Sequence, residues 1–270
     1  MTGEGGVDDG ALAGTAAIAR LLAGARAAVA FTGAGISTES GLPDFRSPGG
    51  LWRGADPARV ASSWALRQNP AEFYSFYRER LGRLGKARPN PAHEALAGLE
   101  AMGVLHCVIT QNVDGLHQAA GSRRVIELHG YLRHAACPGC RGLFPIATLE
   151  EQLAGGAAAL PRCPTCGGLL RPNVVLFGEA LPAGAFAAAG AASDGCDAML
   201  VVGSSLEVWP ANSLPRRALS AGAELAIINL SPTPLDHAAS VVVHAPAGAV
   251  LRAVLAQVRR APRPAGASGP

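Results

Sequence analysis

Residues 27–37 read AAVAFTGAGIS, a short apolar run that ends in a glycine-rich turn. A continuous apolar run bounded by turn residues is typical of a parallel strand that is buried on both faces. Gly33 and Gly35 let the backbone approach a pyrophosphate closely and direct its N–H groups at it. The third glycine of the dinucleotide-binding pattern GxGxxG is missing. These residues alone are therefore equally compatible with an ordinary turn and with a phosphate-binding loop.

Similar apolar runs recur along the chain and predict the rest of a sheet. Each ends in polar or glycine-rich residues, and they cover residues 104–110, 124–128, 198–203, 224–230 and 240–245. Segments with helical spacing of apolar residues separate them, at residues 11–22, 93–102, 210–221 and 246–258. Strands and helices in alternation indicate an α/β fold with a doubly wound, parallel, Rossmann-like sheet, which binds ligands at the carboxyl ends of its strands.

One segment interrupts this alternation. Residues 133–170 are rich in cysteine, proline and glycine, which predicts a small domain inserted into the sheet domain. The sheet domain then comprises residues 11–132 and 171–258. Residues 1–10 and 259–270 have no apolar pattern, and we expect both ends to be disordered.

Composition excludes several classes of protein. Of 270 residues, 49% are hydrophobic and 16% charged, which supplies an ordinary core and excludes a disordered or fibrous chain. The net charge of +3 is too small to attract nucleic acid strongly. No apolar run reaches the roughly 18 residues of a membrane span, and the first residues carry acids where a signal peptide needs bases. We therefore expect a cytoplasmic protein with no membrane partner.

Four of the six cysteines form two CxxC pairs. Cys137 and Cys140 make the first pair, Cys163 and Cys166 the second, and 22 residues lie between them. Two such turns can surround one tetrahedral Zn²⁺ with four thiolates and leave no open position, which indicates a structural zinc-ribbon site. The alternative is a pair of redox dithiols. Cys107 and Cys196 lie in or beside apolar strands and are most simply core residues.

Several motifs together resemble one family. Residues 33–46 read GAGISTESGLPDFR, residues 110–117 TQNVDGLH and residues 128–130 LHG. They are followed by RPNVVLFGE at 171–179, GSSLEVWPA at 203–211 and INL at 228–230. In this order they closely resemble the sirtuins, NAD-dependent protein lysine deacylases, over roughly residues 15–258.

The resemblance implies NAD as co-substrate, structural Zn²⁺ and a set of site residues. His129 would be the general base, since an imidazole is largely neutral at cytosolic pH and can accept a ribose proton. Asn112 and Asp114 would assist it in catalysis. The residues implied to bind NAD are Gly33, Ala34, Gly35, Ser37, Asp44, Phe45, Arg46, Gln111, Asn112, Asp114, Gly203, Ser204, Ser205, Asn229 and Ala247.

The resemblance also implies an acylated lysine of a protein or peptide as substrate. The peptide would add as a strand between residues 174–179 and 206–211, with its acyl-lysine in an apolar tunnel near His129. The implied substrate contacts are Val175, Phe177, Gly178, Glu179 and Val208. The products would be nicotinamide, free lysine and 2′-O-acyl-ADP-ribose.

Two kinds of acyl group on the substrate lysine are compatible with the sequence. Tyr77 and Arg80 share a helix face, and Ala61 stands sixteen residues before Tyr77. In the sirtuin subgroup that removes succinyl, malonyl and glutaryl groups, a Tyr-x-x-Arg pair with such an alanine binds the acyl carboxylate. The same segment also resembles plain deacetylases, so acetyl and acidic acyl groups remain equal alternatives.

Other functions are weighed against this one. Mono-ADP-ribosyl transfer to protein breaks the same glycosidic bond, and an ordinary NAD oxidoreductase would leave nicotinamide attached. A zinc-ribbon nucleic-acid binder needs basic and aromatic residues around the cysteines, where the segment offers only Arg133, Arg141, Arg162 and Phe144. We therefore expect no specific nucleic-acid partner. The sequence leaves the oligomeric state open, and we expect a monomer.

Overall fold

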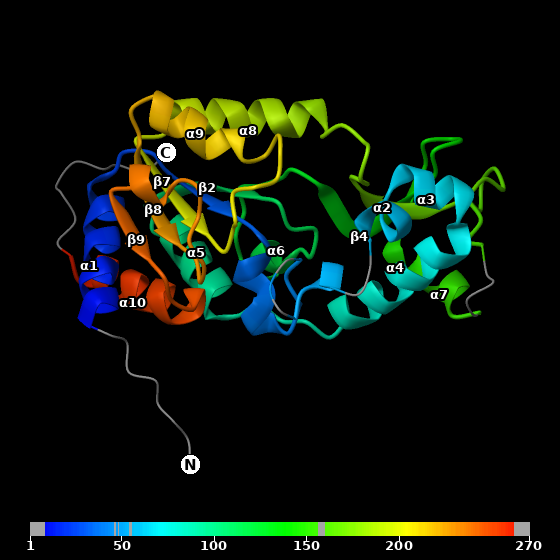
Figure 1. Cartoon of the computed structure of the whole chain (residues 1–270), viewed down its shortest axis with the longest axis horizontal. Coiled ribbons are helices and arrows are strands. Elements are labelled where there is room, and N and C mark those ends of the chain that lie inside the picture. Colours follow the sequence, from blue (N-terminus) through cyan, green and yellow to red (C-terminus); the bar gives the residue numbers. More distant parts are fainter. Residues whose placement is uncertain (1–8, 46, 48, 54–55, 156–159, 262–270) are drawn as a thin grey trace, which may run out of the picture.

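A six-stranded parallel sheet forms the larger part of the molecule (Figure 1). The computed structural model describes residues 9–45, 47, 49–53, 56–155 and 160–261. Its strand order is β3-β2-β1-β7-β8-β9. The strands are β1 (Ala28–Thr32), β2 (Leu105–Thr110), β3 (Val125–Glu127), β7 (Ala198–Val202), β8 (Glu224–Ile228) and β9 (Val241–Val243). Each of the six predicted runs forms one of them, which confirms the predicted fold class.

The order of the strands fixes where a ligand can bind. From β1 the chain first builds outward through β2 and β3, and β7 then starts the other half on the opposite side of β1. The connections therefore diverge between β1 and β7 and leave a crevice beyond the carboxyl ends of these two strands. The glycine-rich turn follows β1 directly, so it lies at this crevice.

Helices cover both faces of the sheet (Figure 1). On one face α1 (Asp9–Gly24), α5 (Pro91–Ala101) and α10 (Ala247–Arg260) pack together over buried aliphatic side chains. On the other face lie α8 (Ala183–Gly195) and α9 (Ser213–Ser220). The four predicted helical segments correspond to α1, α5, α9 and α10, whereas α8 was not predicted because its alanine-rich sequence has no apolar periodicity.

A second, smaller group of elements lies at the other end of the molecule (Figure 1). Its antiparallel sheet has the order β5-β4-β6, from β4 (Gly130–Ala136), β5 (Leu143–Pro145) and β6 (Arg171–Val174). The helices are α2 (Pro57–Val60), α3 (Ser63–Gln68), α4 (Pro70–Leu84) and α7 (Ile146–Leu153). Side chains of α4 share one apolar cluster with this sheet and with two of the paired cysteines. The predicted domain boundaries stay a prediction.

The remaining elements are short. They are α6 (Leu116–Ala119) and the 3-10 helices η1 (Ala34–Ser40), η2 (Leu51–Arg53) and η3 (Asp236–Ala238). Within the described ranges, no helix is long and apolar enough to cross a membrane.

Candidate active site

A cavity of about 970 Å³ lies at the carboxyl ends of the parallel strands and extends to the smaller sheet. It brings together predicted residues that lie far apart in the sequence. Those lining it are Gly33, Ala34, Gly35, Asp44, Phe45, Ala61, Tyr77, Arg80, Gln111, Asn112, His129, Val175, Phe177, Gly178, Glu179, Gly203, Ser204, Ser205, Val208, Asn229 and Ala247. Arg46 lies outside the described residues. Ser37 and Asp114 line an adjoining cavity of about 360 Å³ instead.

Three glycines form the floor of the large cavity. The N–H of Gly35 donates to the carbonyl of Gly203 at 2.9 Å, which joins the turn after β1 to the turn after β7. Gly203 has a φ of +60°, and a Cβ there would lie 2.2 Å from the Ile36 nitrogen. A Cβ on Gly33 would lie 2.8 Å from the Gly203 carbonyl oxygen. Only glycine allows this backbone approach, so the floor offers main-chain groups, as binding of a pyrophosphate requires.

Polar side chains beyond β2 hold one another in fixed positions. The Gln111 amide donates to Ser204 Oγ at 2.9 Å, and the Asn112 amide donates to the Gly33 carbonyl at 3.2 Å and to Ser37 Oγ at 3.1 Å. The Ser37 hydroxyl in turn donates to Asp114 Oδ2 at 2.8 Å. These bonds link the glycine turn to the motif after β2, and both amide residues line the cavity.

His129 stands where the two groups of elements meet. Its Nδ1 lies 2.8 Å from the Gln111 carbonyl oxygen, which can only accept, so the ring proton is on Nδ1 and Nε2 is the free acceptor. Burial lowers the pKa of His129, and the hydrogen bond to Gln111 opposes this only in part. The ring is therefore neutral and able to take up a proton at neutral pH.

Two more histidines lie beneath this site. The sequence around His93 did not indicate which residues it contacts. His93 and His117 are buried with their ring centroids 4.9 Å apart. His117 Nε2 lies 2.9 Å from Thr32 Oγ1, and His93 Nε2 lies 3.4 Å from Ser37 Oγ. Burial lowers the pKa of His93 to about 4 and that of His117 to about 3. Both rings are neutral and contact the polar residues of the site through Ser37 and Thr32.

The segment after β6 forms the wall nearest the smaller sheet. The Phe177 N–H donates to the Ala61 carbonyl and the Ser63 N–H to the Phe177 carbonyl, both at 3.1 Å. Arg171 and Glu179 form a two-pronged ion pair at 2.5 and 2.9 Å, and Glu179 also accepts the Leu176 N–H at 2.9 Å. These contacts brace the segment from behind. Contact of Glu179 with substrate stays a prediction.

Aromatic rings that were not predicted as a group enclose the cavity between these walls. Trp52 stacks on Phe45 with centroids 5.2 Å apart and meets the edge of Phe177 at 5.7 Å. Phe76 of α4 also stacks on Trp52, with ring centroids 5.9 Å apart. Only the fold brings these rings together, because they come from three separate segments.

Tyr77 and Arg80 lie together on the cavity wall, as their spacing predicts. Tyr77 is 3% exposed, and the Arg80 guanidinium lies over the Phe45 ring at 5.4 Å from its centroid. Burial raises the pKa of Tyr77 and lowers that of Arg80, and Tyr77 and Asp114 oppose the latter shift. None of the carboxylates that the structure describes forms an ion pair with Arg80.

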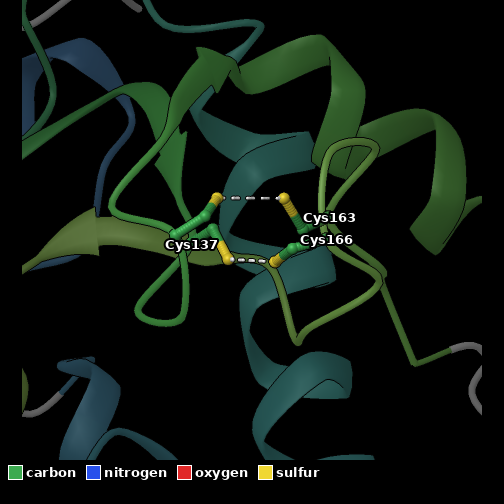
Figure 2. Close-up of side chains that lie close together, drawn as sticks. Cys137, Cys163 and Cys166 are labelled. Carbon is green, nitrogen blue, oxygen red and sulfur yellow. Dashed lines mark hydrogen bonds between the residues drawn. The ribbon is translucent and has the colours of Figure 1, made fainter.

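The four predicted metal ligands converge at the edge of the smaller sheet. Figure 2 shows the sulfur atoms of Cys137, Cys163 and Cys166 pointing toward one another. All four Sγ atoms, including that of Cys140, lie within 4.8 Å of one another, with Cys137–Cys166 at 3.5 Å and Cys140–Cys163 at 3.6 Å. Four sulfurs about 2.3 Å from one tetrahedral Zn²⁺ lie about 3.8 Å apart, so the residues fit this ion.

Comparison with known proteins identifies one family over most of the chain. The model of the Sir2 family matches residues 33–210. A "NAD-dependent protein deacetylase" of Caldivirga maquilingensis is 50% identical over 239 residues, which are 88% of this chain and 91% of the relative. A "NAD-dependent protein deacylase 2" of Pyrobaculum aerophilum is 46% identical over 243 residues, 90% of this chain and 95% of the relative.

Solved structures agree with the sequence comparisons. A Sir2–p53 peptide–NAD⁺ complex is 38% identical, with a TM-score of 0.83 over 91% of this chain and 98% of that one. Sir2Af2 bound to a myristoylated histone peptide is 40% identical, with a TM-score of 0.78 over 92% and 98%.

Proposed function

The chain belongs to the Sir2 family, and from this premise we infer that it is an NAD-dependent protein lysine deacylase. It transfers the acyl group of a modified lysine to the ADP-ribose part of NAD and releases nicotinamide and free lysine. The observation that carries this conclusion is the position of His129. His129 keeps Nε2 free and lines one continuous cavity that runs from the glycine floor to the segment after β6.

Each wall has a distinct task in this reaction. The backbone of Gly33–Gly35 and Gly203 receives the pyrophosphate, and Gln111 and Asn112 hold the nicotinamide end in one orientation. His129 accepts the proton of a ribose hydroxyl when the acyl group is transferred. Phe45 and Trp52 shield the reacting carbon from water, because their stacked rings lie beside the nicotinamide end of the cavity.

The peptide substrate adds as a strand beside residues 174–179. Val175 and Phe177 already use their N–H groups on the carbonyls of His129 and Ala61, which fixes the segment that the peptide meets. Residues 207–210 also line the cavity. Recognition through backbone hydrogen bonds supplies affinity with little dependence on peptide sequence.

The four-cysteine site, when it holds Zn²⁺, stabilises the smaller sheet that supports this wall.

We further propose that the acyl pocket prefers chains that end in a carboxylate. Arg80 is a partly enclosed cation that forms no close ion pair with a described carboxylate, and it lines the same cavity as Tyr77 and the small Ala61. Enclosing a charge without a hydrogen-bonded counter-ion is costly, so a succinyl or malonyl carboxylate would supply one. Acetyl-lysine lacks a carboxylate and would therefore form no ion pair with Arg80.

A product assay tests the function. The enzyme is incubated with NAD and a panel of acetyl, succinyl, malonyl and unmodified forms of one peptide, and the products are identified by mass spectrometry. We expect nicotinamide and acyl-ADP-ribose to form only with acylated peptides. An ADP-ribosylated protein instead would support mono-ADP-ribosyl transfer, and NAD reduced without release of nicotinamide would indicate an oxidoreductase.

A further inference from the structure

One ion pair closes the loop that forms the cavity wall nearest the smaller sheet. Arg171 lies at the start of β6, and Glu179 follows it by eight residues. The two NH groups of the Arg171 guanidinium donate to the two Glu179 carboxylate oxygens, at 2.5 and 2.9 Å. Only 14% of the Arg171 side chain and 29% of the Glu179 side chain are exposed. The pair therefore joins the two ends of the loop where water and salt screen it weakly.

The same two side chains also hold the main chain between them. The guanidinium nitrogen of Arg171 that binds Glu179 Oε2 also donates to the Val174 carbonyl. Glu179 Oε2 accepts the Leu176 N–H at 2.9 Å. One ion pair thus fixes the start, the middle and the end of residues 174–179. This needs the planar fork of an arginine, because the single ammonium group of a lysine cannot reach both oxygens in parallel.

The carboxylate of this pair is ionised. Burial by itself would raise the pKa of Glu179, but the hydrogen bonds from Arg171 and from the Leu176 N–H outweigh burial and hold the pKa below its ordinary value. At neutral pH the loop is therefore closed by a full charge pair, which forms stronger hydrogen bonds than neutral groups would.

The loop held in this way is the segment beside which the peptide substrate is proposed to bind. Val175 and Phe177 line the cavity from it. The Val175 N–H donates to the His129 carbonyl at 2.8 Å, and Phe177 pairs with Ser62 in a parallel bridge. A peptide that adds as a strand needs a partner whose main chain is already ordered, because ordering it on binding would reduce the affinity.

We propose that Arg171 and Glu179 are positioning residues for the acylated peptide, which hold residues 174–179 in the conformation that the peptide strand binds. The inference rests on the proposed deacylase function, and it gives both side chains a role that needs no contact with substrate. Loss of the pair should weaken peptide binding. Binding of the dinucleotide should be retained, because the floor is held by other contacts such as that of the Gly35 N–H with the Gly203 carbonyl.

A second ion pair of the same geometry supplies a matched control. Arg133 of β4 donates from its two NH groups to the two oxygens of Glu127 in β3, both at 2.7 Å. Within the described part of the chain, neither residue lines the large cavity. Arg133→Met therefore removes the same kind of contact from the smaller sheet without touching residues 174–179.

The test measures the dissociation constant of a fluorescent peptide by fluorescence polarisation without NAD, so that no turnover occurs. The peptide is used in its acetyl-lysine and succinyl-lysine forms. In Arg171→Met we expect both forms to bind about 10- to 100-fold more weakly, since a charged two-pronged contact is lost. Arg171→Lys and Glu179→Gln each keep part of the contact and should lose less. Arg133→Met should bind both peptides like the unaltered enzyme.

Two further measurements locate the effect. Calorimetry with ADP-ribose and elemental analysis of zinc should give values close to those of the unaltered enzyme, and in turnover KM for the peptide should rise more than kcat falls. Unchanged peptide affinity in Arg171→Met, or ADP-ribose affinity reduced by the same factor, would overturn the inference alone. If Arg171→Met is insoluble, Arg171→Lys and Glu179→Gln decide by the same criteria. Failure of the unaltered enzyme to release nicotinamide with either acylated peptide would overturn the proposed function as well.

Discussion

The Nδ1 of His129 lies 2.8 Å from the main-chain carbonyl oxygen of Gln111. This bond joins the proposed proton acceptor to the motif after β2, to which we assign the nicotinamide end of the cavity. It also decides which ring nitrogen is free, because a carbonyl oxygen can only accept. A main-chain partner is present whatever the side chain at position 111, so the orientation of the ring depends on the fold itself.

Replacement of His129 should stop turnover and leave the fold intact. His129→Ala removes the proton acceptor, and we expect kcat for deacylation to fall by about 10²- to 10⁴-fold. Circular dichroism and ADP-ribose affinity should stay close to those of the unaltered enzyme. His106→Ala is the control, since that ring is exposed on β2. Full activity in His129→Ala would contradict the assignment.

The buried pair His93 and His117 should make the fold sensitive to acid. Burial holds their pKa values at about 4 and about 3, while in the unfolded chain they titrate near 6.5. Below about pH 6.5 the unfolded chain therefore binds more protons than the folded chain. Proton binding favours the unfolded state, so the free energy of unfolding falls. Each ring should lower the free energy of unfolding by about 1.4 kcal/mol for each pH unit below about 6.5, until the pH reaches its pKa in the fold.

Urea unfolding between about pH 6.5 and about pH 5 measures this loss. In His117→Gln the free energy of unfolding should fall less steeply with decreasing pH than in the unaltered enzyme. His106→Gln changes an exposed histidine and should leave the slope unchanged. Parallel slopes for all three proteins would show that the buried ring is not the source of the acid sensitivity.

Arg80→Met should separate the two candidate acyl groups. A lost hydrogen-bonded charge contact costs about 1.5–3 kcal/mol, which predicts a roughly 10- to 100-fold fall in kcat/KM on a succinyl peptide. On the acetyl form of the same peptide we expect little change. Arg78→Met, exposed on the same helix, is the matched control. An equal loss on both peptides would assign Arg80 a structural role.

Gly203→Ala should abolish dinucleotide binding because of the contact between the two glycine turns. The added Cβ would lie 2.2 Å from the Ile36 nitrogen, so the floor of the cavity must open. Gly222→Ala is the matched control, since Gly222 also has a positive φ, of +92°, but nothing within 4 Å of the added atom. Both variants should lose about 1 kcal/mol of stability from backbone strain. Calorimetry with ADP-ribose should show strong loss in Gly203→Ala alone, and similar affinities in both would contradict the role of this contact.

Loss of the metal should damage the peptide side of the cavity more than the dinucleotide side. Cys137 and Cys163 belong to the apolar cluster that also holds Tyr77, whereas the large sheet has separate clusters. In Cys137→Ser we expect no bound zinc by elemental analysis, little deacylation and retained ADP-ribose binding. Cys196→Ser alters a buried cysteine of the large sheet and should keep one zinc ion per chain. Zinc bound at full stoichiometry by Cys137→Ser would refute the four-thiolate site.

Elements with local signals could be predicted before the fold was known. Each strand of the large sheet is an apolar run, and the CxxC pairs and the glycine turn are read within a few residues. The family resemblance singled out His129 among seven histidines as the predicted general base, and this role stays a prediction. By contrast, α8 and the short strands of the smaller sheet have no periodicity that distinguishes them from loops.

Which distant side chains meet depends on how the strands are placed in the fold. Ser37 and Asp114 are 77 positions apart, and the turns of Gly35 and Gly203 touch across the sheet. The Ser37 contact of His93 and the Thr32 contact of His117 join distant segments, so neither could be read from neighbours in the chain. Periodicity and turn chemistry act over a few residues, whereas burial, contact and hydrogen bonding between distant groups exist only once the strands have been placed side by side.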